Sequence, residues 1–287
     1  MIDLNHLRQW VGNESRERDL ASAAPVAGLA ALLDRDLSFW NEGEVPPLGH
    51  WLYFLPKAGQ SSLSADGHPP RGGLLPPVPL PRRMWAAGAI VFHAPLEIGS
   101  AIERRSTVRD VEHKTGASGE MVFVAVEHRI FGADGTLAIS ERQDIVYRGD
   151  QVAEATIKPT PAKSRPHSDG RDVSARHDVR ADPVLLFRYS ALTFNAHRIH
   201  YDRDYSTGVE GYPGLVVHGP LSATLLVDHF LREAPGSRIS SFEFRARRPL
   251  FDTAPFSLNL RRTDGGAELW TEGPDNRPAM TAELRAR

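Results

Sequence analysis

The segment Leu221-Ser-Ala-Thr-Leu-Leu-Val-Asp-His-Phe-Leu231 is apolar on nearly every face of the helix that its pattern predicts. A helix of this kind is buried on all sides rather than laid along a protein surface. Pro220, directly before it, suits the first helical position because its missing N–H would have no helical partner there, and Gly219 then stands at the cap. We therefore expect a buried helix over residues 220–232 that other elements must cover.

Runs that favour strands follow this helix and also fill the first half of the chain. Turn segments such as Gly116-Ala-Ser-Gly119, Gly132-Ala-Asp-Gly135 and Asp264-Gly265-Gly266 separate several of them. The predicted strands cover residues 89–96, 106–113, 121–131, 137–147, 184–189, 238–250, 256–262, 268–271 and 280–287. Helical patterns are predicted around residues 4–10 and over residues 23–33, and residues 67–81 are predicted to form a loop because they are dense in glycine and proline. The strand order predicts antiparallel meanders in both halves.

A polar stretch over residues 158–180 divides the chain. It holds almost no apolar side chain, so it cannot bury enough surface to fold alone, and we interpret it as a linker. The flanking segments, residues 1–157 and 181–287, share a faint repeat, because Phe92-His-Ala-Pro-Leu-Glu97 resembles Phe244-Arg-Ala-Arg-Arg-Pro-Leu-Phe251. Two copies of one unit, each a buried helix wrapped by a curved antiparallel sheet, predict an α+β double hot dog.

The composition excludes several classes of function. The formal net charge of −2 gives no general affinity for nucleic acid. The absence of cysteine excludes disulfides, thiolate metal sites and a cysteine nucleophile, and it fits a reducing cytoplasm. No run approaches the roughly 20 apolar residues of a membrane span, and the first residues lack the pattern of a signal peptide. We expect a cytoplasmic protein with neither a membrane nor a nucleic-acid partner.

A polar segment follows the predicted strand that ends at Tyr189, and it carries Asn195, His197 and His200. Imidazole is the side chain best placed to exchange protons near neutral pH. The amide of Asn195 can hold a water or a carbonyl group but cannot accept a proton. Asp202, two residues beyond His200, either orients an imidazole or caps a turn. The segment therefore offers groups for proton transfer, and structural roles for single members remain open.

The start of the buried helix offers a second kind of group. The amides of Gly219, Leu221 and Ser222 have no helical acceptor and lie at the positive end of the helix dipole. A thioester carbonyl placed there would be stabilised as it becomes enolate-like, by roughly 3 kcal/mol for one donor. Gly219 lacks a side chain, so a ligand can approach its N–H closely. The alternative is that Gly219 and Pro220 only begin a core helix.

The segment Ala191-Leu-Thr-Phe-Asn-Ala-His-Arg-Ile-His-Tyr-Asp202 resembles, without gaps, the hydratase-2 motif of the MaoC-like enoyl-CoA hydratases, Ser-Gly-Asp-x-Asn-Pro-Leu/Ile-His-x-Asp. The resemblance implies that His200 is the catalytic histidine and that the Gly219 amide binds the thioester oxygen. Asn195 falls on the catalytic aspartate of the motif, and His197 falls on its asparagine. Because Asn195 cannot act as a base, we take His200 as the general base, with Asn195 and His197 positioning water.

Two longer segments narrow the resemblance to one branch of this family. Residues 187–202 with 212–220, and residues 72–88 in the first half, are similar to mesaconyl-C4-CoA (3-methylfumaryl-CoA) hydratases, itaconyl-CoA hydratases and mitochondrial hydroxyacyl-thioester dehydratases. The branch implies a double hot dog with a catalytic second half. The first half has no hydratase motif, which implies one active site per chain. Tyr189 and His218 flank the motif, and we expect both to contact the substrate.

Arginine residues provide candidate sites for the charged parts of such a substrate. Arg82 and Arg83 end a proline-rich loop, and arginine binds a carboxylate in a bidentate manner. They could hold the free carboxylate of a dicarboxylic acyl group, or they could be solvated surface residues. Arg245, Arg247 and Arg248 alternate with phenylalanines along a predicted strand or follow it. These three could meet the phosphates of CoA, or they could form an exposed charged face.

These features favour an acyl-CoA hydratase that converts itaconyl-CoA or mesaconyl-C4-CoA to citramalyl-CoA without a metal or redox cofactor. A 3-hydroxyacyl-thioester dehydratase of fatty-acid synthesis would use the same site in reverse. Loss of the carboxylate at Asn195 also leaves room for a non-catalytic acyl-CoA binding protein or a hot-dog thioesterase. A metal site formed by His197, His200 and His218 is the least favoured alternative, because the spacing matches no known metal signature. By analogy with other hot-dog proteins, a homodimer is compatible with the sequence.

Overall fold

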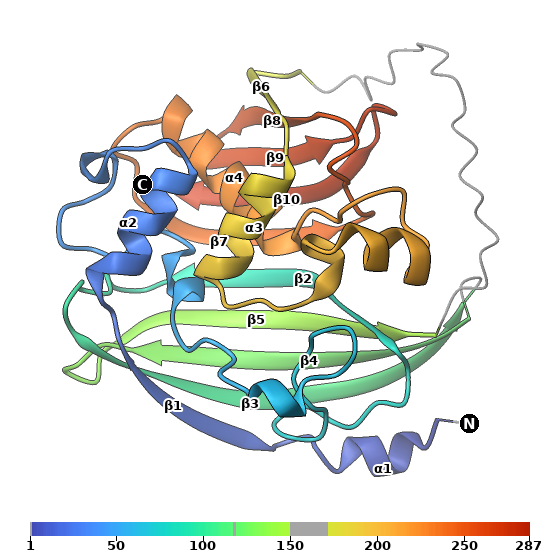
Figure 1. Cartoon of the computed structure of the whole chain (residues 1–287). Coiled ribbons are helices and arrows are strands. Elements are labelled where there is room, and N and C mark those ends of the chain that lie inside the picture. The colour runs from blue at the N-terminus through green and yellow to red at the C-terminus, as the bar shows by residue number, and fades with distance from the viewer. Residues whose placement is uncertain (1, 117–118, 150–171) are drawn as a thin grey trace.

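One antiparallel sheet organises the molecule. The computed structural model describes residues 2–116, 119–149 and 172–287, and all ten strands within these ranges join the sheet (Figure 1). The first half contributes β1 (Glu14–Leu20), β2 (Arg82–Phe92), β3 (Ala101–Gly116), β4 (Gly119–Phe131) and β5 (Leu137–Arg148). The second half contributes β6 (Ala175–Val179), β7 (Ile239–Ala246), β8 (Phe256–Thr263), β9 (Gly266–Glu272) and β10 (Pro278–Ala286).

The two halves repeat the same strand order. The sheet runs β1-β3-β4-β5-β2 in the first half and, reversed in direction, β6-β8-β9-β10-β7 in the second. The halves meet where β2 pairs with β7, from Ala87 opposite Arg245 to Val91 opposite Ser241. The faint sequence repeat begins at the ends of β2 and β7, which occupy equivalent positions, and continues into the residues that follow them. The predicted double hot dog is confirmed, with its two sheets joined edge to edge into one.

Aromatic side chains fill the seam between the halves. The ring of Phe244 on β7 lies against Gly88 on β2, where an added Cβ would stand only 2.5 Å from the ring. Trp85 and Trp51 pack edge-on to the same phenylalanine, with ring centroids 5.5 Å and 6.2 Å away. Gly88 is therefore required for close packing across the seam, since any larger residue would have to displace Phe244.

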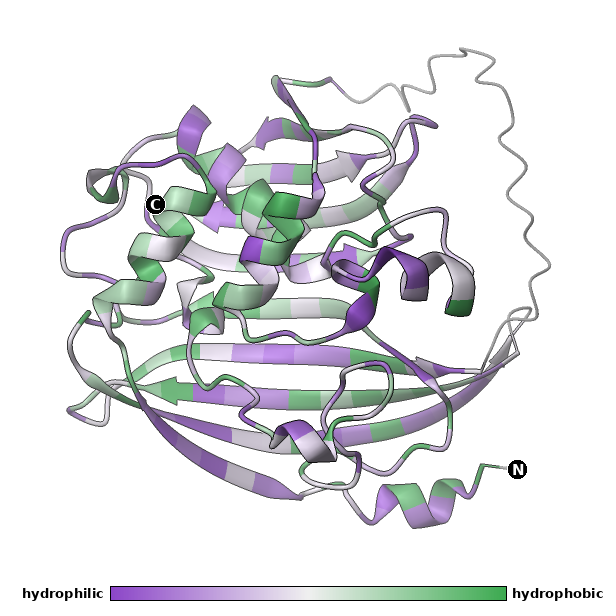
Figure 2. Ribbon diagram, in the orientation of Figure 1, coloured by the Kyte–Doolittle hydropathy of each residue, from purple (hydrophilic) through white to green (hydrophobic). Residues whose placement is uncertain are grey.

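The predicted buried helix is confirmed as α4 (Gly219–Glu233), in which every residue from Leu221 to Leu231 is buried. It packs across β8, β9 and β10. Figure 2 shows it partly hidden behind α3, with both apolar and polar turns in view. The first half has α2 (Ala23–Leu32), close to its predicted bounds, and a short α1 (Leu4–Arg8). Helices α2, α3 and α4 cover the same face of the sheet (Figure 1). No helix in the described residues is long and apolar enough to cross a membrane.

The strand predicted over residues 184–189 is wrong, because these residues belong to the helix α3 (Pro183–Leu192). Asp182 caps the helix by accepting a hydrogen bond from the Leu185 N–H at 2.8 Å, and Pro183 occupies the first turn. Leu186, Tyr189 and Ser190 are the buried residues, and this spacing is helical rather than alternating. The Asp-Pro pair was the signal that identifies the helix start.

The predicted linker extends too far, because residues 175–179 form β6, which pairs with β8 from Ala175 opposite Leu260 to Val179 opposite Phe256. Residues 158–171 of that linker lie outside the described residues. No strand is predicted for residues 14–20, but they form β1 at the other edge of the sheet. Both edge strands carry mostly polar side chains and are held by backbone pairing, so hydrophobic patterns do not reveal them.

Candidate active site

A cavity of about 560 Å³ lies between the two halves and gathers most of the predicted site residues. Seven of them line it: Arg82, Arg83, Asn195, His197, His200, Gly219 and Arg248. A second cavity of about 630 Å³ adjoins the first and shares part of its wall, including Arg83, Asn195 and Pro220. His200 and Gly219, at the start of the buried helix, thus line the same cavity, although they lie nineteen positions apart in the sequence.

The geometry of His200 fixes which of its ring nitrogens faces the cavity. His200 ends the 3₁₀ helix Arg198–His200, and its Nδ1 lies 2.7 Å from the carbonyl oxygen of Val216. A carbonyl oxygen only accepts, so Nδ1 carries the hydrogen and Nε2 keeps its lone pair. Burial lowers the pKa of His200 to about 4, although the Val216 carbonyl opposes this effect. At neutral pH, His200 is therefore a neutral imidazole with a free acceptor nitrogen.

His218 does not line the cavity; its ring packs against the ring of His200. Its ring stacks on that of His200, with centroids 3.7 Å apart, and its Nε2 lies 2.9 Å from the Ser190 hydroxyl. Tyr189 packs edge-on to His218 at 5.0 Å. Burial, with the charges of His200 and His197, lowers the pKa of His218, and burial raises the pKa of Tyr189. The structure places Tyr189 on the wall of the second cavity and His218 behind both cavities.

The start of α4 presents an unpaired backbone amide. The N-cap is His218, one residue earlier than predicted, so Gly219 is the first helical residue. Among the residues that the structure describes, none accepts a hydrogen bond from the Gly219 N–H. An added Cβ at Gly219 would meet no atom within 4 Å. The space before this amide is open to a ligand, as an oxyanion site requires.

Asn195 and His197 hold a tight turn ahead of His200. The Asn195 side-chain oxygen accepts a hydrogen bond from the His197 N–H at 3.0 Å. This leaves the NH₂ group of Asn195 as its donor toward the two cavities that it lines. Burial, together with the charges of His68 and His200, lowers the pKa of His197 to about 2. His197 is therefore neutral at physiological pH.

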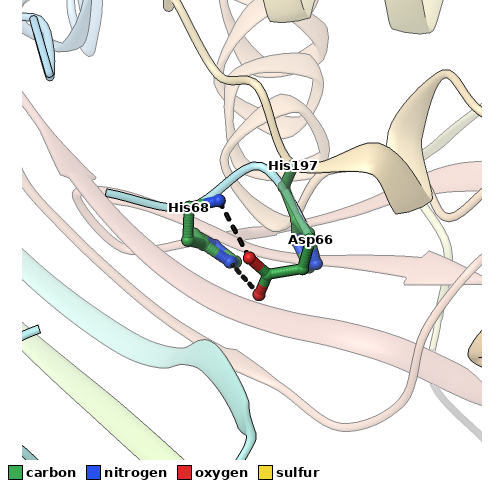
Figure 3. A group of neighbouring side chains, drawn as sticks. All are labelled: Asp66, His68 and His197. Carbon is green, nitrogen blue, oxygen red and sulfur yellow. Dashed lines mark hydrogen bonds and ion pairs between the residues drawn. The ribbon is translucent and has the colours of Figure 1, made fainter. Parts of the chain in front are cut away.

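Sequence reasoning missed Asp66 and His68, which lie on the wall of the same cavity. The Asp66 carboxylate accepts a hydrogen bond from His68 Nδ1 at 2.8 Å, and the His68 ring lies 4.0 Å from that of His197 (Figure 3). Burial raises the pKa of Asp66, but the hydrogen bonds and positive charge of His68 outweigh it and hold that pKa well below its usual range. The sequence around Asp66 indicated only a loop, since nothing local shows where a loop folds back.

The two neighbouring arginines have different partners. Arg82 lies 3.2 Å from the backbone oxygen of Glu210 and 3.4 Å from its carboxylate, and its guanidinium lies over the Tyr212 ring. Arg83 interacts with the Tyr147 hydroxyl, and no carboxylate in the described part of the chain lies within 4 Å of its side-chain nitrogens. Arg83 also lines both cavities. Its charge is the less compensated of the two.

The three arginines of the second half do not act together. Arg248 lines the candidate active site and pairs with Asp275. Arg245 and Arg247 instead line a separate hollow over β7, β9 and β10, where Glu243, Glu268 and Glu283 also lie. The structure therefore brings only Arg248 to the candidate active site. The side chains at 242 and 244 point to the core, so the alternation along β7 sends Arg245 to the opposite face.

Comparisons with known proteins agree with this architecture. Residues 47–252 match the family described as hydroxyacyl-thioester dehydratase type 2. The chain is 46% identical, over 96% of both chains, to a Chloroflexus aurantiacus protein named mesaconyl-C(4)-CoA hydratase. A solved structure titled MaoC-like dehydratase has a TM-score of 0.72 at 15% identity and covers 98% of this chain and 99% of its own. A Mycobacterium tuberculosis protein described as a double hotdog has a TM-score of 0.59 at 14% identity, with 96% of each chain covered.

Proposed function

Because the chain belongs to the hydroxyacyl-thioester dehydratase type 2 family, we propose that it is a hydro-lyase that adds water to an unsaturated dicarboxylic acyl-CoA. The similarity to a protein named mesaconyl-C(4)-CoA hydratase supports this substrate class. Mesaconyl-C4-CoA and itaconyl-CoA are the proposed substrates, and each would give citramalyl-CoA, as in itaconate degradation. The observation that carries the proposal is that the His200 imidazole and the Gly219 N–H reach one cavity.

In the proposed reaction with mesaconyl-C4-CoA, whose double bond is conjugated with the thioester, the thioester oxygen accepts a hydrogen bond from the Gly219 N–H. His200 Nε2 accepts a proton from a water held by the Asn195 NH₂ group, and the water oxygen bonds to the β-carbon. The π electrons of the double bond move toward the thioester, so negative charge develops on the oxygen next to Gly219. A fixed donor at this position stabilises the charge without reorganisation. The α-carbon then takes a proton, and the thioester carbonyl is restored.

We further propose that Arg83 holds the free carboxylate of the acyl group. It lies where the two cavities adjoin, its charge is not paired with a carboxylate in the described residues, and it lies near His197, whose pKa it helps to lower. Arg82 is the weaker candidate because Glu210 already balances part of its charge. Arg248 remains the candidate for a CoA phosphate. The proposal needs no metal or redox cofactor, and cytoplasmic location and a homodimer stay predictions.

Hydration is tested by incubating the protein with mesaconyl-C4-CoA, while following loss of the enoyl-thioester absorbance, and with itaconyl-CoA, while following the appearance of citramalyl-CoA by chromatography. We expect turnover of at least one, and we expect His200→Ala to lower kcat by about 10²–10⁴-fold, the usual range for a proton-transfer residue. Full activity of His200→Ala would contradict the role given to His200. Release of free thiol instead of hydration would show a thioesterase, and tight binding without turnover would show a binding protein.

A dehydratase of 3-hydroxyacyl thioesters is the second candidate, and the second cavity favours it. That cavity is lined largely by apolar and aromatic residues, including Trp51, Phe54, Leu63, Phe187 and Phe194. Such a space would accept a hydrocarbon chain. A comparison of kcat/KM for a medium-chain 3-hydroxyacyl-CoA with that for citramalyl-CoA separates the two functions. Preference for the hydrocarbon chain would favour the dehydratase.

A further inference from the structure

Asn195 leaves the candidate active site short of one proton-transfer group. Hydration removes one proton from water and delivers one to the α-carbon, and an amide does neither at neutral pH. His200 is a weak proton carrier, because burial lowers its pKa to about 4. A second titratable group on the cavity wall would let the two proton transfers occur at separate residues.

Asp66 and His68 have the geometry of such a group. Both line the cavity that holds Asn195, His200 and Gly219. Asp66 binds the Nδ1 of His68 at 2.8 Å and accepts the backbone N–H of His68 at 3.0 Å, so it fixes the ring through two contacts. Since an ionised carboxylate only accepts, Nδ1 carries a hydrogen and Nε2 is the atom left for exchange (Figure 3). A carboxylate placed in this way also stabilises positive charge on the imidazole.

The loop that carries the pair is fastened to the motif segment of the other half. The Arg198 N–H donates to the Asp66 backbone oxygen at 2.9 Å, and the Arg198 side chain donates to the Ala65 oxygen at 3.1 Å. Gly67 has a φ of +89°, and an added Cβ would stand 1.8 Å from the Ala196 oxygen, so no other residue fits there. The position of His68 is thus fixed relative to His197 and His200, although it comes from the first half.

We propose that Asp66 and His68 take over the role of the carboxylate absent at Asn195, with His68 as the acid that protonates the α-carbon and Asp66 as its positioning residue. This inference rests on the proposed hydration. His200 accepts the proton of water as the C–O bond forms, and the electron pair of the double bond reaches the thioester oxygen. That pair then forms the C–H bond at the α-carbon with the proton of His68, whose N–H bond breaks.

The site resets when the proton on His200 returns to His68. His197 lies between them, with its ring 4.0 Å from His68 and 5.5 Å from His200, which leaves a short path through the ring or cavity water. The substrate gains one OH and one H, and the protein is unchanged. Burial is the main cause that lowers the pKa of His200 and of His197, and the charge of His68 adds to it. Both other imidazoles are therefore neutral and ready to accept.

Asp66, His68 and His197 also place three donor atoms within 4.8 Å of one another, a spacing that would suit a metal ion. The direct hydrogen bond between Asp66 and His68 argues for proton transfer, because a cation would have to break it. Metal analysis of the purified protein is therefore one arm of the test. Stoichiometric metal, with activity abolished by a chelator and restored by that metal, would overturn the proposal.

The central arm compares His68→Ala, Asp66→Asn and Asp66→Glu. His93→Gln is the control, because His93 is exposed and its ring hydrogen-bonds Ser140 rather than a residue of the cavity. We expect His68→Ala to lower kcat by about 10²-fold or more, with KM little changed, and added imidazole to restore part of the loss. Asp66→Asn should lower kcat by a smaller factor that Asp66→Glu partly restores. The activity of His93→Gln should equal that of the wild type.

The outcomes separate this inference from the function on which it rests. Hydration by the wild type with unchanged kcat in His68→Ala overturns the Asp66–His68 pair and leaves the hydratase intact. A loss confined to KM or thermal stability, without restoration by imidazole, overturns it as well. If the wild type acts only on straight-chain enoyl-CoA, the substrate class fails and the variants are compared on that substrate. No turnover of any acyl thioester overturns both.

Discussion

At the scale of single residues, the environment of each histidine decides its chemical role more than its place in the motif does. His200 and His218 stack in the core, yet only His200 reaches the cavity, because the His218 ring packs behind it and contacts Ser190. The sequence identified both residues but could not show which of the two lines the cavity and which lies behind it. It could not identify Asp66 or His68, since more than a hundred residues separate them from the motif that they contact.

The low pKa of His200 predicts an unusual acid limb in the pH profile of kcat/KM. His200 must be neutral to accept a proton, and its pKa of about 4 lies below the ordinary value of 6.5. Activity should therefore persist as the pH falls through 6.5 and decline only toward pH 4. Initial rates between pH 8 and pH 4.5, in buffers of constant ionic strength, check this. A midpoint near 6.5 would show that His200 is not the acceptor.

The charge of Arg83, which no carboxylate in the described residues balances, predicts selectivity for dicarboxylic substrates. Removing the charge in Arg83→Gln should lower kcat/KM for mesaconyl-C4-CoA or itaconyl-CoA by about 10²-fold, in line with roughly 3 kcal/mol for a charged hydrogen bond. The same change should leave kcat/KM for crotonyl-CoA, which lacks the carboxylate, nearly unchanged. Arg245→Gln, which alters the separate hollow, is the matched control. Equal losses on both substrates would assign Arg83 a structural role.

At the scale of elements, the periodic apolar patterns predict most of the core strands and helices, and each exception has a physical cause. The core strands β4, β5, β8, β9 and β10 and the helices α2 and α4 lie close to their predicted positions. Helix α3 was mistaken for a strand because a short apolar run fits either period, and only its Asp-Pro start separates them. The edge strands β1 and β6 were not predicted, because backbone pairing with a neighbouring strand holds them rather than burial of apolar side chains.

The open start of α4 predicts that Gly219→Ala folds normally but reacts poorly. Within the described residues, no atom lies within 4 Å of a Cβ there, and alanine is a better helix former than glycine, so thermal stability should be unchanged or slightly raised. The new methyl group would occupy the space that the thioester oxygen needs, and kcat/KM should fall by about 10²-fold. Gly208→Ala, also into open space but at an exposed position of the short π-helix Tyr205–Val209, should keep full activity. Equal activity of both variants would exclude the amide from the reaction.

At the scale of the whole molecule, the candidate active site depends on the seam where β2 pairs with β7, because residues from both halves line its cavity. The second half supplies His200 and Gly219, and the first half supplies Arg83, Asp66 and His68. The shared strand order shows why a faint repeat in the sequence predicted the fold. It could not show that the first half brings Arg83, Asp66 and His68 to the cavity beside the motif of the second half, because that depends on contacts across the seam.

Close packing at the seam predicts that Gly88→Ala destabilises the entire fold. The added Cβ would stand 2.5 Å from the Phe244 ring, which Trp51 and Trp85 hold in place. Overpacking of this kind costs about 1–3 kcal/mol. Urea unfolding followed by tryptophan fluorescence should show a lower midpoint for Gly88→Ala than for Gly73→Ala, whose Cβ meets no atom within 4 Å. An unchanged midpoint would mean that the halves are not packed as described.

The central claim is that one thioester meets the Gly219 N–H and the His200 imidazole together. A crystal structure with a saturated dicarboxylic acyl-CoA, which cannot be hydrated, tests this most directly. We predict a thioester oxygen about 2.7–3.1 Å from the Gly219 nitrogen, with the β-carbon facing His200 Nε2 and the free carboxylate on Arg83. A thioester bound in the hollow of Arg245 and Arg247, or one whose oxygen points away from α4, would contradict the account.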